Sequence, residues 1–442
     1  MIELEPKSNY TFNNMWSNEA EATSGILAIY NQMQSTFKTN YAYWGDGRSD
    51  MLVRYNNDNE ALYLIDNALV ATMSSSDWNS LYKVISRSNF AIKYIPKVPE
   101  LTYTKTNLTG TEERPFFARA LSYFYIVRVW GEAPLINFPY DSDTLDFEVP
   151  SAPVERIWAQ ITADLDSASL YLPNEYNSEN SYNFDNFRLN RGRATRAAAW
   201  AAQTDVYMWL KNYQKADSVA TKFETLTRYY NSSSKKWNLA VNFGDISLRR
   251  DKLITYPAEG IFELQFNKDE GAESNMSTLW HSNFNTFGAS DKFINLFESQ
   301  DSRKVFYDAN KVYKFFGPVY ANYQTINKDQ NIILYRLADV LLLRAEALNK
   351  LGNKTKAVEL MNIIRARAML PASSVTESST VDEIENALLD ERAKELLGEG
   401  KRWFDLVRTG KAIPVMQPIN NLSDPLNIFG LYMLITLELT LN

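Results

Sequence analysis

The 442-residue sequence contains no cysteine and a single histidine, His281. Without cysteine, the chain cannot form a disulfide bond, a thiol nucleophile or a cysteine-ligated metal site. A single histidine excludes metal sites that need several histidine ligands, and it leaves little room for a Ser–His catalytic triad. We therefore expect a protein with no metal and no cofactor.

An excess of basic residues is also lacking. The net charge is −7 at pH 7, and the pI is about 5.2. A protein that binds nucleic acid neutralises phosphates with a basic face. The charge balance therefore argues against a nucleic acid as the partner.

Long apolar runs and a secretory leader are absent as well. No run reaches the roughly 18 apolar residues of a membrane-spanning helix, and IFGLYMLITL near the C-terminus is about half that length. Met1 leads directly into the polar segment IELEPKSNYTF, which is unlike a signal peptide. Taken alone, these features predict a soluble protein.

Aromatic residues are plentiful. The chain has 10 Trp, 26 Tyr and 23 Phe, which together make 13% of its residues and exceed what an ordinary helical core needs. Most of these rings are expected to fill helix–helix contacts. The remainder favour a carbohydrate-binding protein, because a flat ring packs against the apolar C–H face of a sugar while its polar edge forms hydrogen bonds.

The stretch 331–411 carries the clearest helical pattern. It opens with IILYRLADVLLLRAEALNKLG, which is apolar almost all the way round a helix and so predicts a helix buried on every side. Its charged residues are spaced so that Arg336 lies beside Asp339, and Glu346 beside Lys350. A Gly-Asn pair then ends the helix. A second helix (TKAVELMNIIRARAML) and a third from about residue 381 follow, with the small residues typical of tetratricopeptide-like repeats.

Three blocks of this stretch closely resemble the C-terminal signature of the SusD/RagB family. They are LYRLADVLLLRAEALNKLG, NIIRARA and ERAKELLGEGKRWFDLVRTG, in that order. The segment 111–136 is similar to a second family block, an arginine-containing helix that runs into a Gly-x-x-Pro-Leu turn. Asp301 and Arg303 resemble the Asp-x-Arg motif of the family.

The resemblance implies a function and a location. Members of this family are outer-membrane lipoproteins of Bacteroidetes that capture glycans for a SusC-like TonB-dependent transporter during polysaccharide utilisation and nutrient uptake. The implied partners are an oligosaccharide or polysaccharide and that transporter. The implied location is the cell surface, through a lipid anchor whose signal peptide and cysteine are absent from this sequence.

Earlier segments of the chain predict further helices. They span residues 13–37, 77–96, 111–136, 154–173 and 192–226. Tyr213 and Ala216 in the last of these repeat the pattern of Thr355 and Ala357. The spacing of such pairs is not regular, so a uniform solenoid is not expected.

We therefore expect a mainly α, SusD-like helical bundle with several tetratricopeptide-like helix pairs, an irregular loop-rich region and few short strands. It would form a single domain over residues 1–442. The helical scaffold is predicted at 13–228 and 331–411, and the irregular region at about 230–330. Within that region, EGIFELQFN (259–267) alternates like a strand.

Ligand contacts are expected on irregular segments, because these tend to carry binding residues on a rigid scaffold. We predict that Trp44, Trp237, Trp280, Tyr320 and Tyr323 bind the ligand, since these rings stand in loops or polar surroundings. The prediction rests on ring chemistry and context. The sugar-contacting loops of the family carry no motif that could be aligned.

Glu391, Glu395 and Glu399 follow one another at four-residue spacing and would share a helix face. A glycoside hydrolase needs two carboxyl groups across a cleft, about 5–9 Å apart, with the pKa of one of them raised. Basic residues crowd the same stretch, so ion pairs within the helical core are the favoured interpretation. We expect a binding protein and not an enzyme. A glycoside hydrolase and a peptide-binding helical-repeat scaffold are the alternative functions.

Two loops and the C-terminal tail give weaker indications of function. The Gly-Asp-Gly turn at 45–47 lacks the third glycine of a nucleotide-binding loop. Asp141, Asp143, Asp146 and Glu148 lack the spacing of an EF-hand, so a solvated acidic loop is favoured over a calcium site. The tail LYMLITLELTLN lacks the prolines with which the family usually closes, and no function is assigned to it.

Overall fold

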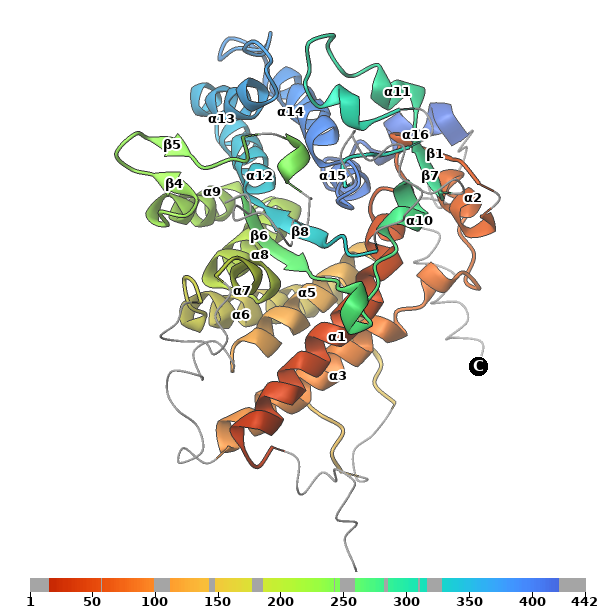
Figure 1. The fold of residues 1–442 in the computed structure, drawn as a ribbon, viewed down its shortest axis with the longest axis vertical. Coiled ribbons are helices and arrows are strands. Elements are labelled where there is room, and N and C mark those ends of the chain that lie inside the picture. The colour runs from red at the N-terminus through yellow and green to blue at the C-terminus, as the bar shows by residue number, and fades with distance from the viewer. Residues whose placement is uncertain are drawn as a thin grey trace, which may run out of the picture.

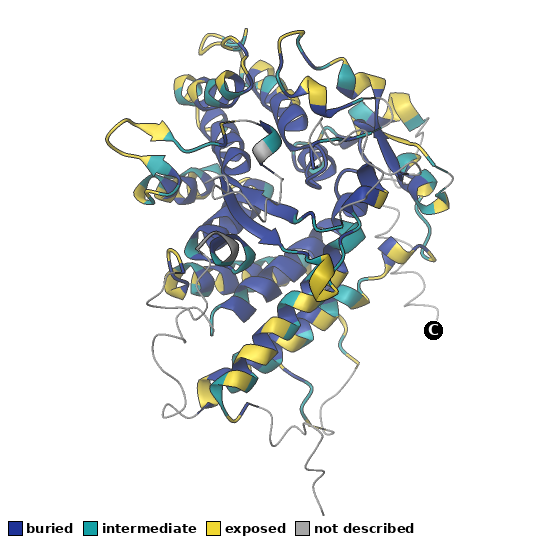
Figure 2. Cartoon of the chain, in the orientation of Figure 1, coloured by how far each residue is buried: buried dark blue, intermediate teal, exposed yellow. Residues whose placement is uncertain are grey.

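The structure, a computed structural model, is mostly helical, with helices packed side by side through the body of the molecule (Figure 1). It describes residues 16–56, 58–98, 112–142, 148–176, 186–241, 243–246, 259–281, 285–308, 311–315 and 328–420. Buried residues face inward along nearly every helix, and α1 and α3 keep one exposed face (Figure 2). One hydrophobic cluster connects these buried faces.

The elements are distributed along the whole described chain. The helices are α1 (Glu19–Trp44), α2 (Asn59–Ile65), α3 (Asn79–Tyr94), α5 (Arg114–Val129), α6 (Val154–Tyr171), α7 (Asn186–Gly192), α8 (Arg196–Trp209), α9 (Tyr213–Thr221), α10 (Met276–Trp280), α11 (Asp291–Ile294), α12 (Leu337–Lys350), α13 (Lys354–Arg367), α14 (Val381–Leu396), α15 (Arg402–Arg408) and α16 (Ala412–Asn420). The strands are β1 (Leu52–Arg54), β2 (Ala133–Pro134), β3 (Ser151–Ala152), β4 (Tyr230–Asn231), β5 (Lys236–Trp237), β6 (Gly260–Leu264), β7 (Phe287–Ala289) and β8 (Ile332–Arg336). The strands form two-stranded antiparallel sheets: β1 with β7, β2 with β3, β4 with β5, and β6 with β8.

The helices pack in chain order. α1 packs against α3, α3 against α5, α5 against α6 and α6 against α8. Helices α8 and α9 form one hairpin and α12 and α13 another, and α12 also packs against α9 and α14. Residues 337–349 of α12 are all buried, as the all-round apolar pattern predicts. The prediction of a mainly α bundle of tetratricopeptide-like pairs is confirmed.

The turns of these two hairpins have the same construction. Lys211 and Gly352 adopt positive φ angles of 57° and 84°, which favour glycine. The next residue, Asn212 or Asn353, then caps the second helix. Its side chain accepts a hydrogen bond from the backbone N–H three residues later, at 3.1 and 3.3 Å respectively. The alanine four residues after each cap is fully buried, so the repeat seen in the sequence is a structural repeat.

The helix predicted from Ile332 begins later, at Leu337. Residues 332–336 form strand β8, which pairs with β6 and places Arg336 opposite Gly260. An apolar run buried on both faces has no period that distinguishes a strand from a buried helix. The predicted strand at 259–267 is confirmed as β6, and it is the partner that fixes the conformation of β8.

The first helix also differs from its predicted bounds. It was expected over 13–37 followed by a loop, but α1 begins after the Asn18 cap and continues to Trp44. No glycine or proline interrupts residues 26–44, so nothing in the chain ends the helix earlier. Residues 13–15 lie outside the described part. The predicted helices at 77–96, 111–136 and 154–173 are confirmed as α3, α5 and α6.

Candidate functional site

The carboxylates that resembled a hydrolase pair lie inside a cluster of buried charges, called here the buried charge cluster. Its members are Glu259, Arg303, Lys314, Arg336, Arg367, Glu391, Glu395 and Glu399, each of which is at least half-buried. Nη1 of Arg336 lies 2.6 Å from Oε1 of Glu395 and 2.5 Å from Oε1 of Glu259. Nη1 of Arg303 lies 2.7 Å from Glu391 and 2.9 Å from Glu395. The interpretation of these glutamates as ion-paired is confirmed.

The electrostatics of Glu395 do not suit an acid catalyst. Burial alone would raise the pKa of this carboxyl, but the charges of Arg367, Arg336 and Arg303 hold the pKa well below its usual range. The acid of a glycoside hydrolase needs the opposite shift, so that it carries a proton to donate at neutral pH. Glu395 is therefore ionised and fixed in place.

The predicted pairing within α12 is wrong in its partners. Arg336 pairs across the fold with three glutamates, whereas Asp339 pairs with Arg392 at 2.8 Å and Lys401 at 2.9 Å. Glu346 pairs with Arg408, and Lys350 pairs with a glutamate of α14. A helix that is buried all round finds its partners on neighbouring elements, because no solvent-facing side exists on which local pairs could form.

The Gly-Asp-Gly turn after α1 holds two parts of the chain together. The carboxylate of Asp46 is fully buried and accepts hydrogen bonds from the backbone N–H groups of Gly398, Gly400 and Arg402, at 2.9, 2.8 and 3.1 Å. Burial raises the pKa of Asp46 to about 6. The turn fastens α1 to residues 398–402, and this role replaces the faint resemblance to a nucleotide loop.

The structure corrects the prediction for Trp44 and Trp280, because neither presents a ring face to solvent. The exposed fractions of the two side chains are 3% and 0%. The indole N–H of Trp44 donates to the carbonyl of Ser75 at 2.7 Å, and that of Trp280 donates to the hydroxyl of Tyr41 at 2.8 Å. Both rings are therefore parts of the core.

The structure describes only one of the other three predicted residues. Trp237 lies on β5, is half-buried and packs on Tyr230 with 4.8 Å between ring centroids. Tyr320 and Tyr323 lie outside the described residues. The structure does not bring Trp44, Trp237 and Trp280 into one site, because Trp237 lies on the β4–β5 hairpin, far from the β1–β7 sheet beside which Trp280 packs (Figure 1).

A different group of polar and aromatic side chains does gather at the β1–β7 sheet. We call it the tyrosine surface and define it as Tyr55, His281, Asp308 and Tyr313. Tyr55 follows β1, bonds through its N–H to the carbonyl of Thr286 and is 42% exposed. The rings of His281 and Tyr313 lie edge to face at 5.5 Å, and the Tyr313 hydroxyl donates to Asp308 at 2.8 Å.

The phenol of Tyr313 is held in its protonated form. Burial, the hydrogen bond to Asp308 and the charge of Asp308, with a smaller effect from Tyr55, together raise the pKa of Tyr313 to about 12. Burial also lowers the pKa of His281, so its imidazole is neutral at pH 7. The surface therefore presents neutral phenol groups and one carboxylate, and the imidazole of His281 is buried beside Tyr313. These residues come from segments far apart in sequence, so no spacing in the chain predicts that they lie together.

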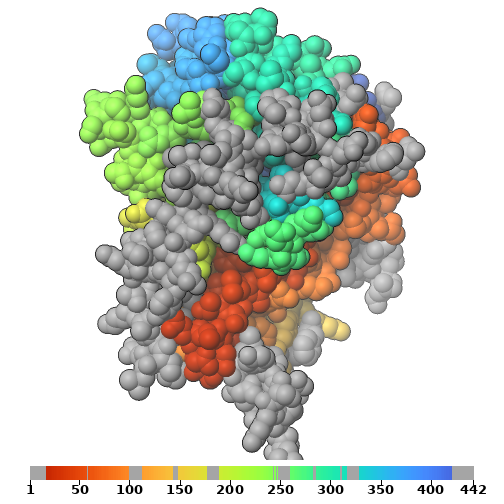
Figure 3. All heavy atoms as spheres, in the orientation of Figure 1, coloured from red at the N-terminus to blue at the C-terminus, as the bar shows by residue number. Residues whose placement is uncertain are grey.

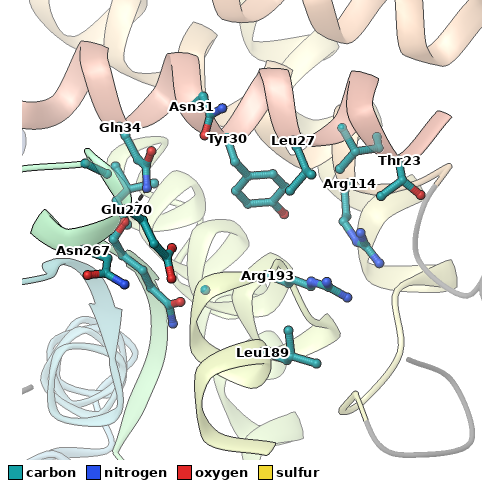
Figure 4. A pocket seen from close by; sticks show the side chains of 15 residues that line it. Thr23, Leu27, Tyr30, Asn31, Gln34, Arg114, Leu189, Arg193, Asn267 and Glu270 are labelled. Carbon is teal, nitrogen blue, oxygen red and sulfur yellow. Dashed lines mark hydrogen bonds between the residues drawn. The ribbon is translucent and has the colours of Figure 1, made fainter. Parts of the chain in front are cut away.

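A concave pocket of about 440 Å³ lies elsewhere, between α1, α7 and the end of β6 (Figure 4). On one side of the Tyr30 ring lie Arg114 and Arg193, and on the other lie Gln34, Asn267 and Glu270. In Figure 3, α1 (red) meets the segment after β6 (green) on one face of the molecule. Of the predicted binding residues that the structure describes, Trp44, Trp237 and Trp280, none lines this pocket.

Among the residues that the structure describes, no group of three or more His, Asp or Glu side chains is placed to hold a metal ion. Asp141, from the acidic loop, instead pairs with Lys93 and Tyr94. Residues 143–147 of that loop lie outside the described part.

Two family models match the chain on either side of its middle. The model described as the SusD family matches residues 306–423, and the model described as "Starch-binding associating with outer membrane" matches residues 3–208. A relative, SusD-like protein P38 of Formosa agariphila, is 29% identical over 98% of this chain and 92% of its own length. The chain belongs to the SusD family. Neither model of the family reaches residues 209–305, where Trp237 and Trp280 lie.

Other SusD-family proteins resemble the whole chain. SusD-like protein P25 of Formosa agariphila is 24% identical over 95% of this chain and 88% of its own length. The structure of a SusD superfamily protein from Bacteroides thetaiotaomicron superposes with a TM-score of 0.77 at 21% identity, covering 96% of this chain and 97% of that one. A laminarin binding SusD-like protein gives a TM-score of 0.74 at 22% identity, covering 94% and 97%. The fold is therefore that of the SusD superfamily.

The description of one of the two family models names both a ligand and a cellular location. The match over residues 3–208 is to starch-binding proteins associated with the outer membrane, which makes this chain a member of a glycan-binding, outer-membrane-associated family. Within the described ranges, the helices are too short or too polar for any of them to cross a bilayer.

Proposed function

We propose that this protein binds glycans at the cell surface without cleaving them and passes the oligosaccharide to a partner TonB-dependent transporter. The observation that carries the proposal is a contrast between the two kinds of side chain. Tyrosines lie on irregular segments at the tyrosine surface, whereas the glutamates of the buried charge cluster are enclosed in ion pairs, and Glu395 among them is ionised.

The tyrosine surface has the chemistry of a sugar site. Phenol rings supply flat apolar faces for the C–H side of a pyranose, and their hydroxyls bond to sugar hydroxyls. Asp308 adds a carboxylate acceptor, fixed by its bond from Tyr313. Such partly solvated sites bind through a few well-placed polar groups and through bridging waters. Tyr320 and Tyr323 remain proposed contributors, and Trp237, on the distant β4–β5 hairpin, remains a proposed glycan contact apart from this surface.

A glycoside hydrolase is the less favoured function. Hydrolysis would need a protonated carboxyl facing a cleft, and Glu395 is instead ionised among three arginines. Glu391 and Glu399 also lie in ion pairs, with Arg303 and Lys314 respectively. The described part of the chain therefore supports binding over cleavage.

The test is retention in native gels that contain starch, laminarin or other polysaccharides. Wild-type protein is expected to be retarded by at least one of them. Tyr313→Ala and Tyr55→Ala should lose the retardation, because each removes a ring and a hydroxyl from the tyrosine surface. The matched control is Tyr171→Ala, which removes a tyrosine that is 60% exposed on α6 and should leave retardation unchanged.

The same polysaccharides also test catalysis. No new reducing ends should appear after incubation with wild-type protein. Release of reducing ends that stops in Glu395→Gln, a variant shown to fold by circular dichroism, would replace the binding proposal with hydrolysis.

The transporter is tested by purifying the tagged protein from detergent-solubilised outer membranes of its source. A TonB-dependent transporter should co-purify, and recovery of the tagged protein alone would contradict the partner assignment.

A further inference from the structure

The pocket between α1, α7 and the end of β6 shares no residue with the tyrosine surface. Its volume of about 440 Å³ falls within the range of small-molecule sites. Side chains from several chain segments converge on it, and they are arranged unevenly. Basic groups lie at one end, amides and a carboxylate lie at the other, and leucine and isoleucine side chains lie between them (Figure 4).

At the basic end of the pocket, two arginines pack against the ring of Tyr176. The guanidinium carbons of Arg114 and Arg193 lie 5.0 and 5.7 Å from the centroid of Tyr176, and Nε of Arg114 donates to the Tyr176 hydroxyl at 3.0 Å. Both guanidinium groups also act on the phenol of Tyr30. Two guanidinium groups that both line the pocket are thus held close together in a partly desolvated place.

The electrostatics of Arg193 agree with this geometry. Burial lowers the pKa of Arg193, and the neighbouring charge of Arg114 lowers it further. A guanidinium group presents a planar fork of donors that matches a carboxylate or a sulfate. The basic end is therefore suited to a small oxyanion.

The rest of the pocket is suited to a polar ring. The hydroxyl of Tyr30 accepts the N–H of Ala194 at 2.9 Å, so its own hydrogen remains available to a ligand. The amide of Gln34 donates to the carbonyl of Gln265, which leaves its oxygen as an acceptor at the pocket wall. Leu27 and Leu264 supply apolar surface for the C–H face of a sugar.

We propose that this pocket is a second binding site, which takes an acidic sugar with its carboxylate or sulfate at Arg114 and Arg193. The sugar ring lies along Tyr30 and Leu27, and its hydroxyls reach the amides of Gln34 and Asn267. The site is separate from the proposed glycan surface and does not depend on it.

The test is isothermal titration calorimetry of the full chain with galacturonic acid, galactose 6-sulfate and galactose, with saturation-transfer NMR to detect weak contacts. Both acidic sugars, or one of them, should bind at least about tenfold more tightly than galactose, because a charge-assisted fork is lost in the neutral sugar. The acidic sugar that binds more tightly shows whether the site prefers a carboxylate or a sulfate.

Matched variants locate the binding in this pocket. Arg193→Gln should weaken the acidic sugar at least about tenfold, and Leu27→Trp should block it. Leu27 is 52% exposed, so the larger ring does not enter the core. The controls are Arg156→Gln and Leu170→Trp, which alter exposed residues of α6 and should change nothing.

Several outcomes would overturn the proposal. They are binding of galactose as tight as that of the acidic sugars, equal binding of inorganic sulfate, absence of binding by both acidic sugars, and binding that survives Leu27→Trp. Tyr313→Ala should leave acidic-sugar binding unchanged, and its loss in that variant would assign the sugar to the tyrosine surface. The two sites can therefore fail independently.

Discussion

Trp280 and Trp237 are the same residue type in two different surroundings. The ring of Trp280 is enclosed by Tyr41, Phe287 and Phe315, and its N–H has a buried acceptor. The ring of Trp237 is half-buried and packs chiefly on its cross-strand partner Tyr230. At this scale, a ring is available to a ligand only when the fold leaves one of its faces uncovered.

Alanine substitution should separate these two tryptophans. Trp280→Ala is expected to lower the free energy of unfolding by about 3–5 kcal/mol, because it opens a large cavity and removes the donor to Tyr41. Trp237→Ala should cost about 1 kcal/mol, the loss of one half-exposed ring contact. Urea denaturation followed by circular dichroism at 222 nm measures both. Equal losses in the two variants would contradict the burial difference.

The sequence predicts the pairing state of charges better than the exposure of rings. Glu391, Glu395 and Glu399 stand among basic residues in the chain, so ion pairing follows from local composition. Trp280 also stands among polar residues, but the rings that cover it come from positions 41, 287 and 315. Exposure depends on those long-range contacts, and no local pattern contains them.

At the scale of elements, the end of α1 and the turn at 398–402 are built against each other. Asp46 accepts three backbone N–H groups of that turn, and Gly45 lies so close to Gly400 that a Cβ on Gly45 would overlap the backbone of Gly400. Gly400 itself has a φ of 71°, and a Cβ there would lie 2.5 Å from the carbonyl oxygen of Tyr41. The contact therefore joins the first helix to the last third of the chain through glycine backbone.

Two glycines of the same conformation test this contact. Gly400→Ala and Gly410→Ala both place a side chain at positive φ, 71° and 73°, but a Cβ at Gly410 meets nothing within 4 Å. Gly410→Ala should cost about 1 kcal/mol from backbone strain alone. Gly400→Ala should lower the free energy of unfolding by at least about 3 kcal/mol more, because the backbone carbonyl of Tyr41 cannot move away from the added Cβ. Urea unfolding measures the difference, and equal costs would show that the two elements are not in close contact.

The strand β8 shows why element type was predictable only in part. Its sequence, IILYR, continues directly into the apolar helix α12, and both are buried on all sides. Burial removes the polar positions that reveal a period of 2 or 3.6. The partner strand β6, some 70 residues earlier, decides the conformation, whereas the caps and glycines of the α12–α13 turn are local and were predictable.

At the scale of the whole molecule, buried ion pairs connect segments that are distant in the chain. Arg336 of β8 pairs with Glu259, the residue before β6, and with Glu395 of α14, and Arg402 of α15 pairs with Asp50 beyond α1 at 3.0 Å. Removing one member of such a pair leaves an uncompensated buried charge, which costs far more than the pair contributes over an apolar replacement. The stability of the fold should therefore depend on these ion pairs staying intact.

Acid should consequently unfold this protein. Although burial opposes ionisation, neighbouring cations hold the pKa values of Glu395, Asp339, Asp405 and Asp50 below their ordinary values. A depressed folded-state pKa contributes stability that is complete above the unfolded pKa, about 4, and is lost as pH falls below it, by about 1.4 kcal/mol for each unit of depression. Asp46, with its pKa raised to about 6, has the opposite sign, but its effect lies between about pH 4 and 6.

The window below pH 4 therefore isolates the depressed carboxylates. The melting temperature, measured by circular dichroism, should fall steeply from pH 4 to pH 2.5. Sodium chloride at 0.5 M should leave that slope nearly unchanged, because buried pairs are screened far less than exposed ones. Asp339→Asn serves as the matched variant: it removes one depressed carboxyl and should flatten the slope. A melting temperature that stays level down to pH 2.5, or a slope that salt abolishes, would show that surface charges and not the buried pairs govern acid stability.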